Sequence, residues 1–190
     1  MKILVIDGHP NNESLCSTLA EKYVQGANAG GHEVDLLKIR DLDFNPNLQY
    51  GYAKPMDLEQ DLIKVQDLIR ECDHIVLVLP YWWSGLPALF KGFVDRVLLP
   101  GFAFQFTENG KLKPLLKDKT ARVIYTQGSP AFFTTLFLRD AFWTSLKIGI
   151  LGFCGFSPVK RTYLDNISKA SKARIGNFLE DVYKLGKLAK

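Results

Sequence analysis

The alternation of short apolar runs with helical segments constrains the fold of this chain more than any other feature. Four runs are rich in Val and Ile and end in turn residues, as is typical of buried parallel strands. They cover residues 2–7, 33–39, 74–79 and 121–126, and a weaker fifth lies near 159–164. Helical patterns fill the intervals at 14–29, 58–71, 87–99 and 135–151. Strand and helix therefore alternate along the chain.

This alternation predicts right-handed crossovers onto a parallel sheet with helices on both faces. With five strands we expect a flavodoxin-like α/β fold in the strand order 2-1-3-4-5. Ligands of such sheets bind beyond the carboxyl ends of the strands, where the order reverses between strands 1 and 3. A length of 190 residues with 47% hydrophobic content suits one domain spanning residues 1–190. Function should thus be encoded just after strands 1, 3 and 4.

Charge and cysteine content argue against a nucleic-acid-binding protein, a disulfide-bonded protein and a metal site. The net charge is +4, with eight basic residues against three acidic ones from Lys160 onward. Nucleic-acid binding is one reading, but the basic residues are spaced along an amphipathic helix expected from about Lys169, so a solvated helix face is favoured. The three cysteines are far apart without a CxxC pair, which indicates neither disulfides nor a metal site. We expect a cytoplasmic protein.

Membrane insertion is not expected. The most apolar stretch, residues 136–156, carries Arg139, Asp140 and Lys147, which a bilayer would disfavour strongly, so a core helix is the better interpretation. The chain opens directly on a strand, and we identify no targeting segment.

The loop from Gly8 to Ser17 follows the first strand and leads into a helix. Free backbone amides at a helix start, the hydroxyls of Ser14 and Ser17, and His9 can together receive a phosphate. An ordinary capped helix is an equal alternative, in which Asn12 or Ser14 satisfies the amides. Neither GxGxxG nor GxxxxGK[ST] occurs, so the dinucleotide fingerprint of Rossmann folds and the P-loop are excluded.

The next two strand ends carry aromatic residues and a glycine turn. Tyr81, Trp82 and Trp83 are costly to expose, so a flat ligand is expected to cover them, although at least one can pack under the sheet or in an interface. The segment 126–129 offers amides to a ring edge through Gly128. Two long stretches, 41–56 and 101–118, are predicted to be functional or interfacial.

At this point a resemblance emerges. The segment Gly8-His9-Pro10, the motif Pro80-x-x-Trp83-x-x-x-Pro87-Ala88-x-x-Lys91-Gly92-x-x-Asp95-Arg96-Val97 and the segment Gly101-Phe102-Ala103-Phe104 are similar to the NAD(P)H quinone reductase family. That family includes mammalian quinone reductases, bacterial modulator-of-drug-activity proteins and the ancillary flavoproteins of potassium efflux systems. The likeness implies a bound flavin, FAD or FMN, a two-electron hydride transfer from NAD(P)H, and a homodimer with sites at the subunit boundary.

The matched positions imply a flavin site at the three strand ends. The residues expected to bind it are His9, Ser14, Leu15, Cys16 and Ser17 at the phosphate, Pro80, Tyr81, Trp82 and Trp83 along the ring, and Thr126, Gln127, Gly128 and Ser129 at its polar edge. A Tyr and a His that aid hydride transfer in the mammalian enzymes are replaced near Phe132 and Phe133, so no catalytic side chain is assigned. Trp83, Phe132 and Phe133 are expected to receive a flat small-molecule acceptor such as a quinone, an azo compound or a nitroaromatic.

Two alternatives remain open. A regulatory flavoprotein could bind a membrane transporter through the basic C-terminal helix. A one-electron carrier is disfavoured by the positive net charge, because such carriers are typically acidic. Cys16, at a helix start, is either a redox-active thiol or, more plausibly, a packed residue beside the phosphate.

Overall fold

Five parallel strands form the centre of the computed structural model, which describes residues 1–190. The strands are β1 (Lys2–Asp7), β2 (Glu33–Lys38), β3 (His74–Tyr81), β6 (Thr120–Gln127) and β7 (Val159–Leu164). Their order is β2-β1-β3-β6-β7, which confirms the predicted 2-1-3-4-5 topology. Two strands are longer than predicted, because Pro80 and Tyr81 of β3 pair with Thr126 and Gln127 of β6.

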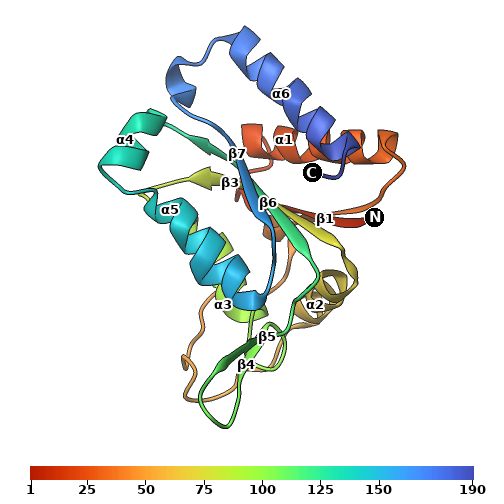
Figure 1. Cartoon of the computed structure of the whole chain (residues 1–190), viewed down its shortest axis with the longest axis vertical. Helices are drawn as coiled ribbons and strands as arrows, with labels where there is room; N and C mark the ends of the chain where they lie inside the picture. The colour runs from red at the N-terminus through yellow and green to blue at the C-terminus, as the bar shows by residue number, and fades with distance from the viewer.

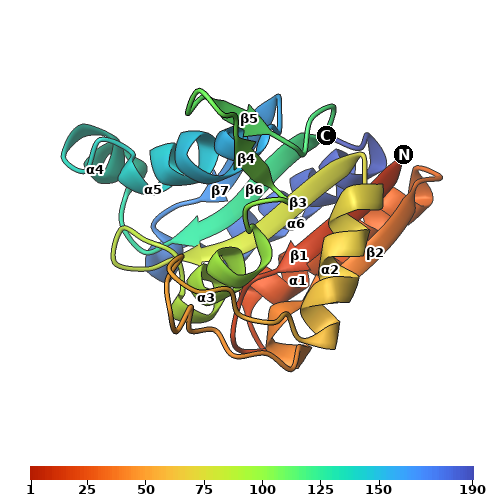
Figure 2. The same ribbon diagram turned by 90° about the horizontal axis from the view of Figure 1, so that it is seen from below.

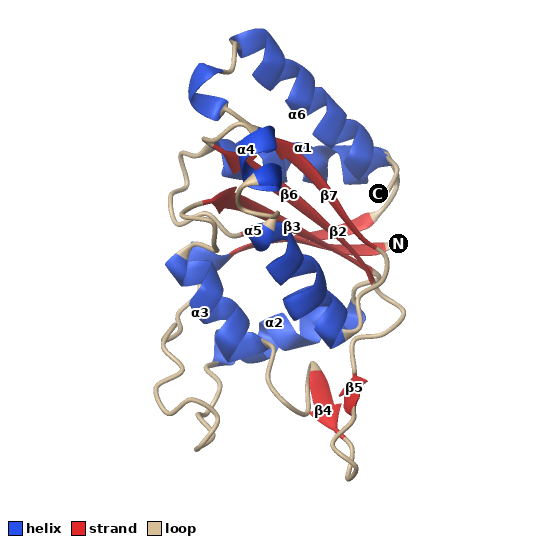
Figure 3. Cartoon of the chain, turned by 60° about the vertical axis from the view of Figure 1, so that its left-hand side comes forward, coloured by secondary structure: helices blue, strands red, loops and turns tan.

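Helices cover both faces of the sheet (Figures 1 and 3). Helices α1 (Leu15–Ala29) and α6 (Lys172–Lys187) lie side by side on one face. The other face carries α2 (Gln60–Glu71), α3 (Ala88–Val97) and α5 (Ala141–Thr144), which continues into a π-helix, η2 (Ser145–Gly152). Short 3₁₀ turns follow β2 and β7, at η1 (Ile39–Asp41) and η3 (Ile167–Lys169). None of the helices combines the length and apolar composition needed to cross a bilayer.

Alternating side chains of the strands build two separate cores. In β1, Leu4 and Ile6 pack with the α2, α3 and η2 side, whereas Ile3 and Val5 pack with α1 and α6. This period of two follows from the pleat of a strand, which sends successive side chains to opposite faces. Both faces are apolar because both are covered, which explains the continuous hydrophobic runs seen in the sequence.

Glycines allow α1 and α6 to approach backbone to backbone. A Cβ atom at Gly26 would lie 2.0 Å from the carbonyl oxygen of Tyr183, and one at Gly186 would lie 2.1 Å from that of Tyr23. No larger residue fits either position without moving a helix. We call this contact the α1–α6 seam.

The helix predicted at 135–151 is wrong as a single element. Helix α4 (Ala131–Leu136) ends early, and Arg139 and Asp140 adopt left-handed conformations with φ near 50° before α5 begins. The amide of Asp140 donates to the carbonyl oxygen of Thr134 at 3.0 Å, which ties the turn back to α4. The carboxylate of Asp140 also binds Arg161 at 3.0 Å, which holds the break in place.

The stretch 101–118 contains a small antiparallel hairpin. Strands β4 (Phe104–Phe106) and β5 (Leu112–Pro114) pair with each other and project from the body of the molecule (Figures 1 and 3). Figure 2 shows the hairpin beside α5, and Figures 1 and 3 show it at the end of the molecule opposite α6.

The long stretch after η1 is fixed to α3 by a buried arginine. Arg96 is fully buried, and its guanidinium donates to the carbonyl oxygens of Asn45 and Asp57, each at 2.8 Å. It also forms an ion pair with Glu59 at 2.8 Å. One turn earlier, a Cβ atom at Gly92 would lie 2.5 Å from Pro46. The irregular segment therefore has a defined path over α3.

Candidate functional site

The ends of β1, β3 and β6 meet as the sequence predicts. The rings of His9 and Trp82 contact edge to face, with centroids 5.3 Å apart, which joins the first loop to the second. Cys16 Sγ lies 3.6 Å from Thr126 Oγ1, which joins the first loop to the third. An open cavity of about 570 Å³ lies beside these contacts. Its lining residues are Tyr81, Trp82, Trp83, Ser84, Thr126, Gly128, Ser129, Phe133, Leu138 and Ile167.

The loop before α1 combines a helix cap with unpaired amides. Ser14 is the N-cap, and its hydroxyl accepts from the amide of Ser17 at 3.1 Å, so the capped-helix interpretation is correct for this residue. The backbone N–H groups of Asn12, Ser14, Leu15 and Cys16 have no acceptor in the protein. The cap therefore leaves four donors free at the positive end of a 15-residue helix, where backbone amides favour negative charge. The helix cap is confirmed, and phosphate binding by the free amides stays a prediction.

A buried ion pair beneath this loop was not predicted. Asp7, at the end of β1, is fully buried, and its Oδ2 lies 2.7 Å from Arg40 Nη1. The same oxygen accepts from the Ser17 hydroxyl at 2.7 Å. Ser17 is thus buried and directed toward Asp7. An acid at the end of a buried strand was the available signal, but its partner Arg40 comes from the turn η1 after β2 and could not be identified from local sequence.

His9 lies at the junction of the first two loops. Its Nδ1 is 2.9 Å from the amide nitrogen of Asn11 and 3.0 Å from the Asn11 carbonyl oxygen. That nitrogen is therefore engaged within the loop whichever tautomer is present. The Nε2 atom remains available for a ligand.

The aromatic loop after β3 turns through an unusual backbone conformation. Trp83 and Ser84 have φ values of 51° and 58°, in the left-handed region that non-glycine residues seldom adopt. Trp83 is fully exposed, whereas Tyr81 packs against Phe142 with ring centroids 5.0 Å apart. Tyr81 also donates its hydroxyl to Ser84 at 3.0 Å. An exposed indole held in a strained turn is a feature typical of a binding site.

The loop after β6 presents backbone rather than side chains to the cavity. The amides of Gly128 and Ser129 have no acceptor in the protein. Gln127 is buried, and its Nε2 donates to the carbonyl oxygen of Ser129 at 3.0 Å, so its side chain shapes the turn. Of the two phenylalanines that follow, Phe133 lines the cavity, and Phe132 is 67% exposed outside it.

Like Ser17 and Gln127, the predicted site residues Pro80 and Cys16 lie underneath rather than in the cavity. Pro80 is buried within β3. Cys16 is 2% exposed, and burial raises the pKa of its thiol to about 12 despite the hydrogen bond with Thr126. A thiol that stays protonated is a poor nucleophile, so the packed interpretation of Cys16 is favoured over a redox-active one.

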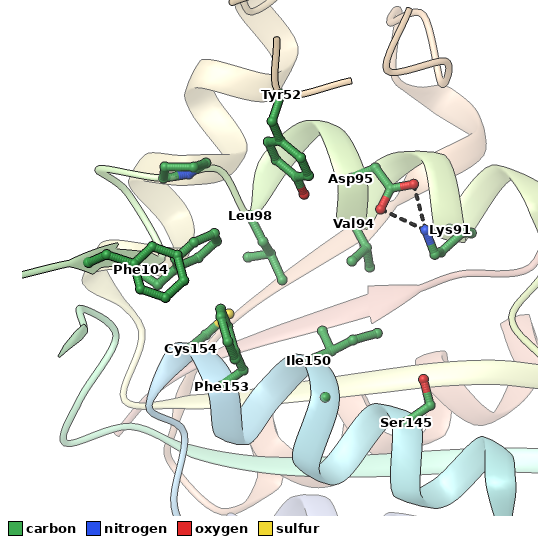
Figure 4. A pocket seen from close by; sticks show the side chains of 13 residues that line it. Tyr52, Lys91, Val94, Asp95, Leu98, Phe104, Ser145, Ile150, Phe153 and Cys154 are labelled. Carbon is green, nitrogen blue, oxygen red and sulfur yellow. Dashed lines mark hydrogen bonds and ion pairs between the residues drawn. The ribbon is translucent and has the colours of Figure 1, made fainter. Parts of the chain in front are cut away.

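A second cavity of about 540 Å³ lies between α3, the β4–β5 hairpin and η2 (Figure 4). Val94 and Leu98 of α3 face Ile150 and Phe153 across it, and Tyr52 comes from the long stretch after η1. The ion pair between Lys91 and Asp95 lies at one end, with nitrogen and oxygen 2.6 Å apart. The sequence identified both long stretches as candidate interfaces but did not predict this groove.

Comparison with known proteins assigns the family. A family model for the flavodoxin-like fold matches residues 1–185. The chain belongs to the flavodoxin-like family. This flavodoxin-like protein is 33% identical over 184 residues to an uncharacterized NAD(P)H oxidoreductase of Haemophilus influenzae, covering 92% of this chain and 91% of that protein. It is 28% identical over 183 residues to the rat ribosyldihydronicotinamide dehydrogenase [quinone], covering 82% and 77% of the two chains.

The solved structures give the same result. A crystal structure from Streptococcus mutans superposes with a TM-score of 0.88 at 32% identity, covering 99% of this flavodoxin-like protein and all of that chain. The resemblance stated from the motifs is confirmed, and the chain is an oxidoreductase. The alternative of a transporter-binding regulatory subunit is not favoured, since these relatives are named as oxidoreductases or dehydrogenases.

Proposed function

We propose that this protein is a flavin-dependent NAD(P)H oxidoreductase that passes two electrons, as a hydride, to quinone-like or other flat aromatic acceptors. The observation that carries the proposal is the set of unpaired backbone amides at two neighbouring strand ends beside an aromatic cavity. A flavin needs donors for its phosphate, a flat apolar surface for its ring system and donors for its carbonyl oxygens. This edge of the sheet offers all three, so the residues present fit the cofactor.

The phosphate would lie over the start of α1. The free amides of Asn12, Ser14, Leu15 and Cys16 would donate to it, with His9 adding a further donor. Ser17 and the side chain of Cys16 would support this seat from below, since both are buried. Both FMN and FAD carry this phosphate, so the same amides can bind either cofactor. If the cofactor is FAD, Tyr50 and Tyr52, in the stretch after η1, are our candidates for contact with its adenine.

The flavin ring would lie along Tyr81, Trp82 and Trp83, with Pro80 behind them. The amides of Gly128 and Ser129 would meet its polar edge, with Thr126 beside them and Gln127 holding the turn. The cofactor supplies the hydride chemistry, and the protein supplies position and hydrogen-bond donors that favour negative charge on the reduced ring. Backbone amides take this role here because no His follows His74. We assign no catalytic side chain.

One cavity would receive NAD(P)H and the acceptor in turn. The exposed Trp83 and Phe133 would cover a flat molecule from two sides, and Phe132 would add apolar surface at the rim. Such a shared site predicts ping-pong kinetics. Planar acceptors such as quinones, azo compounds and nitroaromatics share the required shape.

We further propose that the chain acts as a homodimer of single-domain subunits in the cytoplasm. The groove of Figure 4 is apolar and open, and Phe106 at its edge is 61% exposed, which makes this face a candidate for contact with a second copy. The three cysteines are free and buried, which fits a reducing compartment.

A direct experiment tests the proposal. The purified protein is expected to carry a yellow flavin or to take up FMN or FAD, and NADH or NADPH is expected to bleach it under anaerobic conditions. A simple quinone should then restore the colour. If neither nucleotide bleaches bound flavin, the proposed reductase activity is wrong.

Replacing Gly128 by Val is expected to weaken flavin binding without loss of fold. A Cβ atom at this position meets nothing within 4 Å, and φ is not positive, so the protein tolerates the side chain. The branched side chain would instead occupy the space beside the two free amides. Flavin titration should show at least a roughly tenfold weaker Kd, and the urea midpoint should be unchanged. Gly176→Val, at an exposed glycine of α6 that also has open space and lines neither cavity, is the control. Equal flavin affinity in both variants would remove Gly128 from the site.

A further inference from the structure

Arg40 reaches from the end of β2 across the loop that precedes α1. Lys38 pairs with Asp7 in the sheet, which brings the following 3₁₀ turn, η1, beside the end of β1. From there Arg40 Nη1 donates to Asp7 Oδ2 at 2.7 Å and to the carbonyl oxygen of His9 at 3.0 Å. Its Nη2 donates to Asn12 Oδ1 at 2.7 Å. One guanidinium thus joins the end of β1 to two points of the loop.

The charged side chain of Arg40 is largely shielded from solvent, which is costly for a guanidinium. Its side chain is only 9% exposed, and its Nε has no hydrogen-bond partner although it is shielded from solvent. A buried ion pair contributes little net stability compared with apolar residues of similar size. The Arg40–Asp7 pair is therefore better explained by the geometry that it imposes on residues 8–13 than by stability alone.

The loop before α1 offers a phosphate no free Lys or Arg side chain, so the positions of its backbone amides matter. Arg40 is neutralised by Asp7, and the loop itself carries Glu13 but no Lys or Arg. A dianionic phosphate would therefore be recognised mainly by backbone amides, whose dipoles act only when they converge on one point. Arg40 contacts His9 and Asn12, and the first of the free amides is that of Asn12 itself.

We infer that Arg40 is a positioning residue for the cofactor phosphate: through Asp7, the His9 carbonyl and Asn12 it holds the loop in the conformation that receives the phosphate. This inference rests on the proposed flavin function. It assigns to Arg40 an effect on the phosphate alone and none on the flavin ring, which lies against other loops.

The test compares FMN with riboflavin, which has the same ring and no phosphate. Flavin fluorescence titrations of the whole protein are expected to show that Arg40→Met weakens FMN binding about tenfold or more and leaves riboflavin binding unchanged. Arg40→Lys should remain weak, because an ammonium cannot make the three-point contact of a guanidinium. The matched control is Lys38→Met. It removes a positive charge at the end of β2, two residues before Arg40, where the side chain pairs with Glu21 and not with the loop.

Arg40→Met leaves the Asp7 carboxylate buried without its arginine partner, which could unfold the protein. A second variant therefore separates the effect on FMN binding from a loss of stability. In Asp7→Asn/Arg40→Met no buried charge remains, and selective loss of FMN affinity is still expected. Three outcomes would each overturn the inference although the wild-type protein binds flavin. The first is an equal loss of affinity for FMN and riboflavin. The others are wild-type FMN affinity in either Met variant and wild-type FMN affinity in Arg40→Lys. A wild-type protein that binds FMN no better than riboflavin would remove the phosphate seat itself and, with it, the role of Arg40.

Discussion

Replacing Arg96 by Met is expected to lower the free energy of unfolding by about 3–4 kcal/mol. The substitution leaves the carboxylate of Glu59 and the carbonyl oxygens of Asn45 and Asp57 without the donor that now satisfies them. The two carbonyl oxygens lose charged donors that are fully buried, which is costly, whereas the Glu59 side chain is 31% exposed and can be rehydrated in part. Urea unfolding followed by circular dichroism measures the loss.

Two comparisons make this result specific to the buried network. Lys64→Met removes an exposed partner of Asp61 and should change stability by less than about 0.5 kcal/mol. Arg96→Lys should recover only part of the loss, since a single ammonium cannot reach both carbonyls and the carboxylate in the same geometry. If Arg96→Met is as stable as wild type, the stretch after η1 is not held in the way described.

Acidification is expected to destabilise the protein through His74. Its ring is buried at the start of β3, with Nδ1 2.6 Å from Thr120 Oγ1 and Nε2 unpaired. Burial, reinforced by the charges of Arg122 and Lys160, lowers the pKa of His74 from 6.5 to about 4. Between these two values the unfolded chain binds a proton that the folded protein does not. Stability due to neutral His74 is therefore complete above pH 6.5 and is lost as the pH falls toward 4.

The expected loss is about 2.5 kcal/mol at pH 4.5 relative to pH 7.5. Because carboxylates also titrate in this range, the measurement is the difference between wild type and His74→Gln in urea midpoints at the two pH values. The variant should lose less stability on acidification by about that amount. Parallel losses in both proteins would show that His74 protonates freely in the fold.

Strand order and site location could be predicted because they depend on local pattern. The run at β1 was predicted with its observed bounds, since an apolar strand covered on both faces leaves a strong signal. The weaker run near 159–164 also coincides with β7. The meeting of three loops followed from topology alone and is observed in the contacts of His9 with Trp82 and Cys16 with Thr126. Which side chains face the cavity was less predictable: Gln127 and Ser17 are polar, yet both turn inward.

The features that sequence could not provide join residues distant along the chain. Arg40 meets Asp7 across 33 residues, and Arg96 meets Glu59 across 37. Neither arginine differs in local pattern from a surface residue, so only the folded arrangement identifies them. The break at Asp140 was missed for a related reason, because its left-handed conformation is supported by Arg161 on β7. Local helix propensity was overridden there by a tertiary contact.

The α1–α6 seam also has a consequence for how the chain is completed during translation. Helix α1 is among the first elements to leave the ribosome, yet the glycine-lined face that it presents is matched only by α6, made more than 140 residues later. Until then the sheet can cover part of the apolar side of α1, but the part that faces α6, including Tyr23, has no permanent cover. Such a nascent chain exposes hydrophobic surface for most of its synthesis. We therefore expect intermediates lacking α6 to be the species that chaperones bind and that aggregate at high expression.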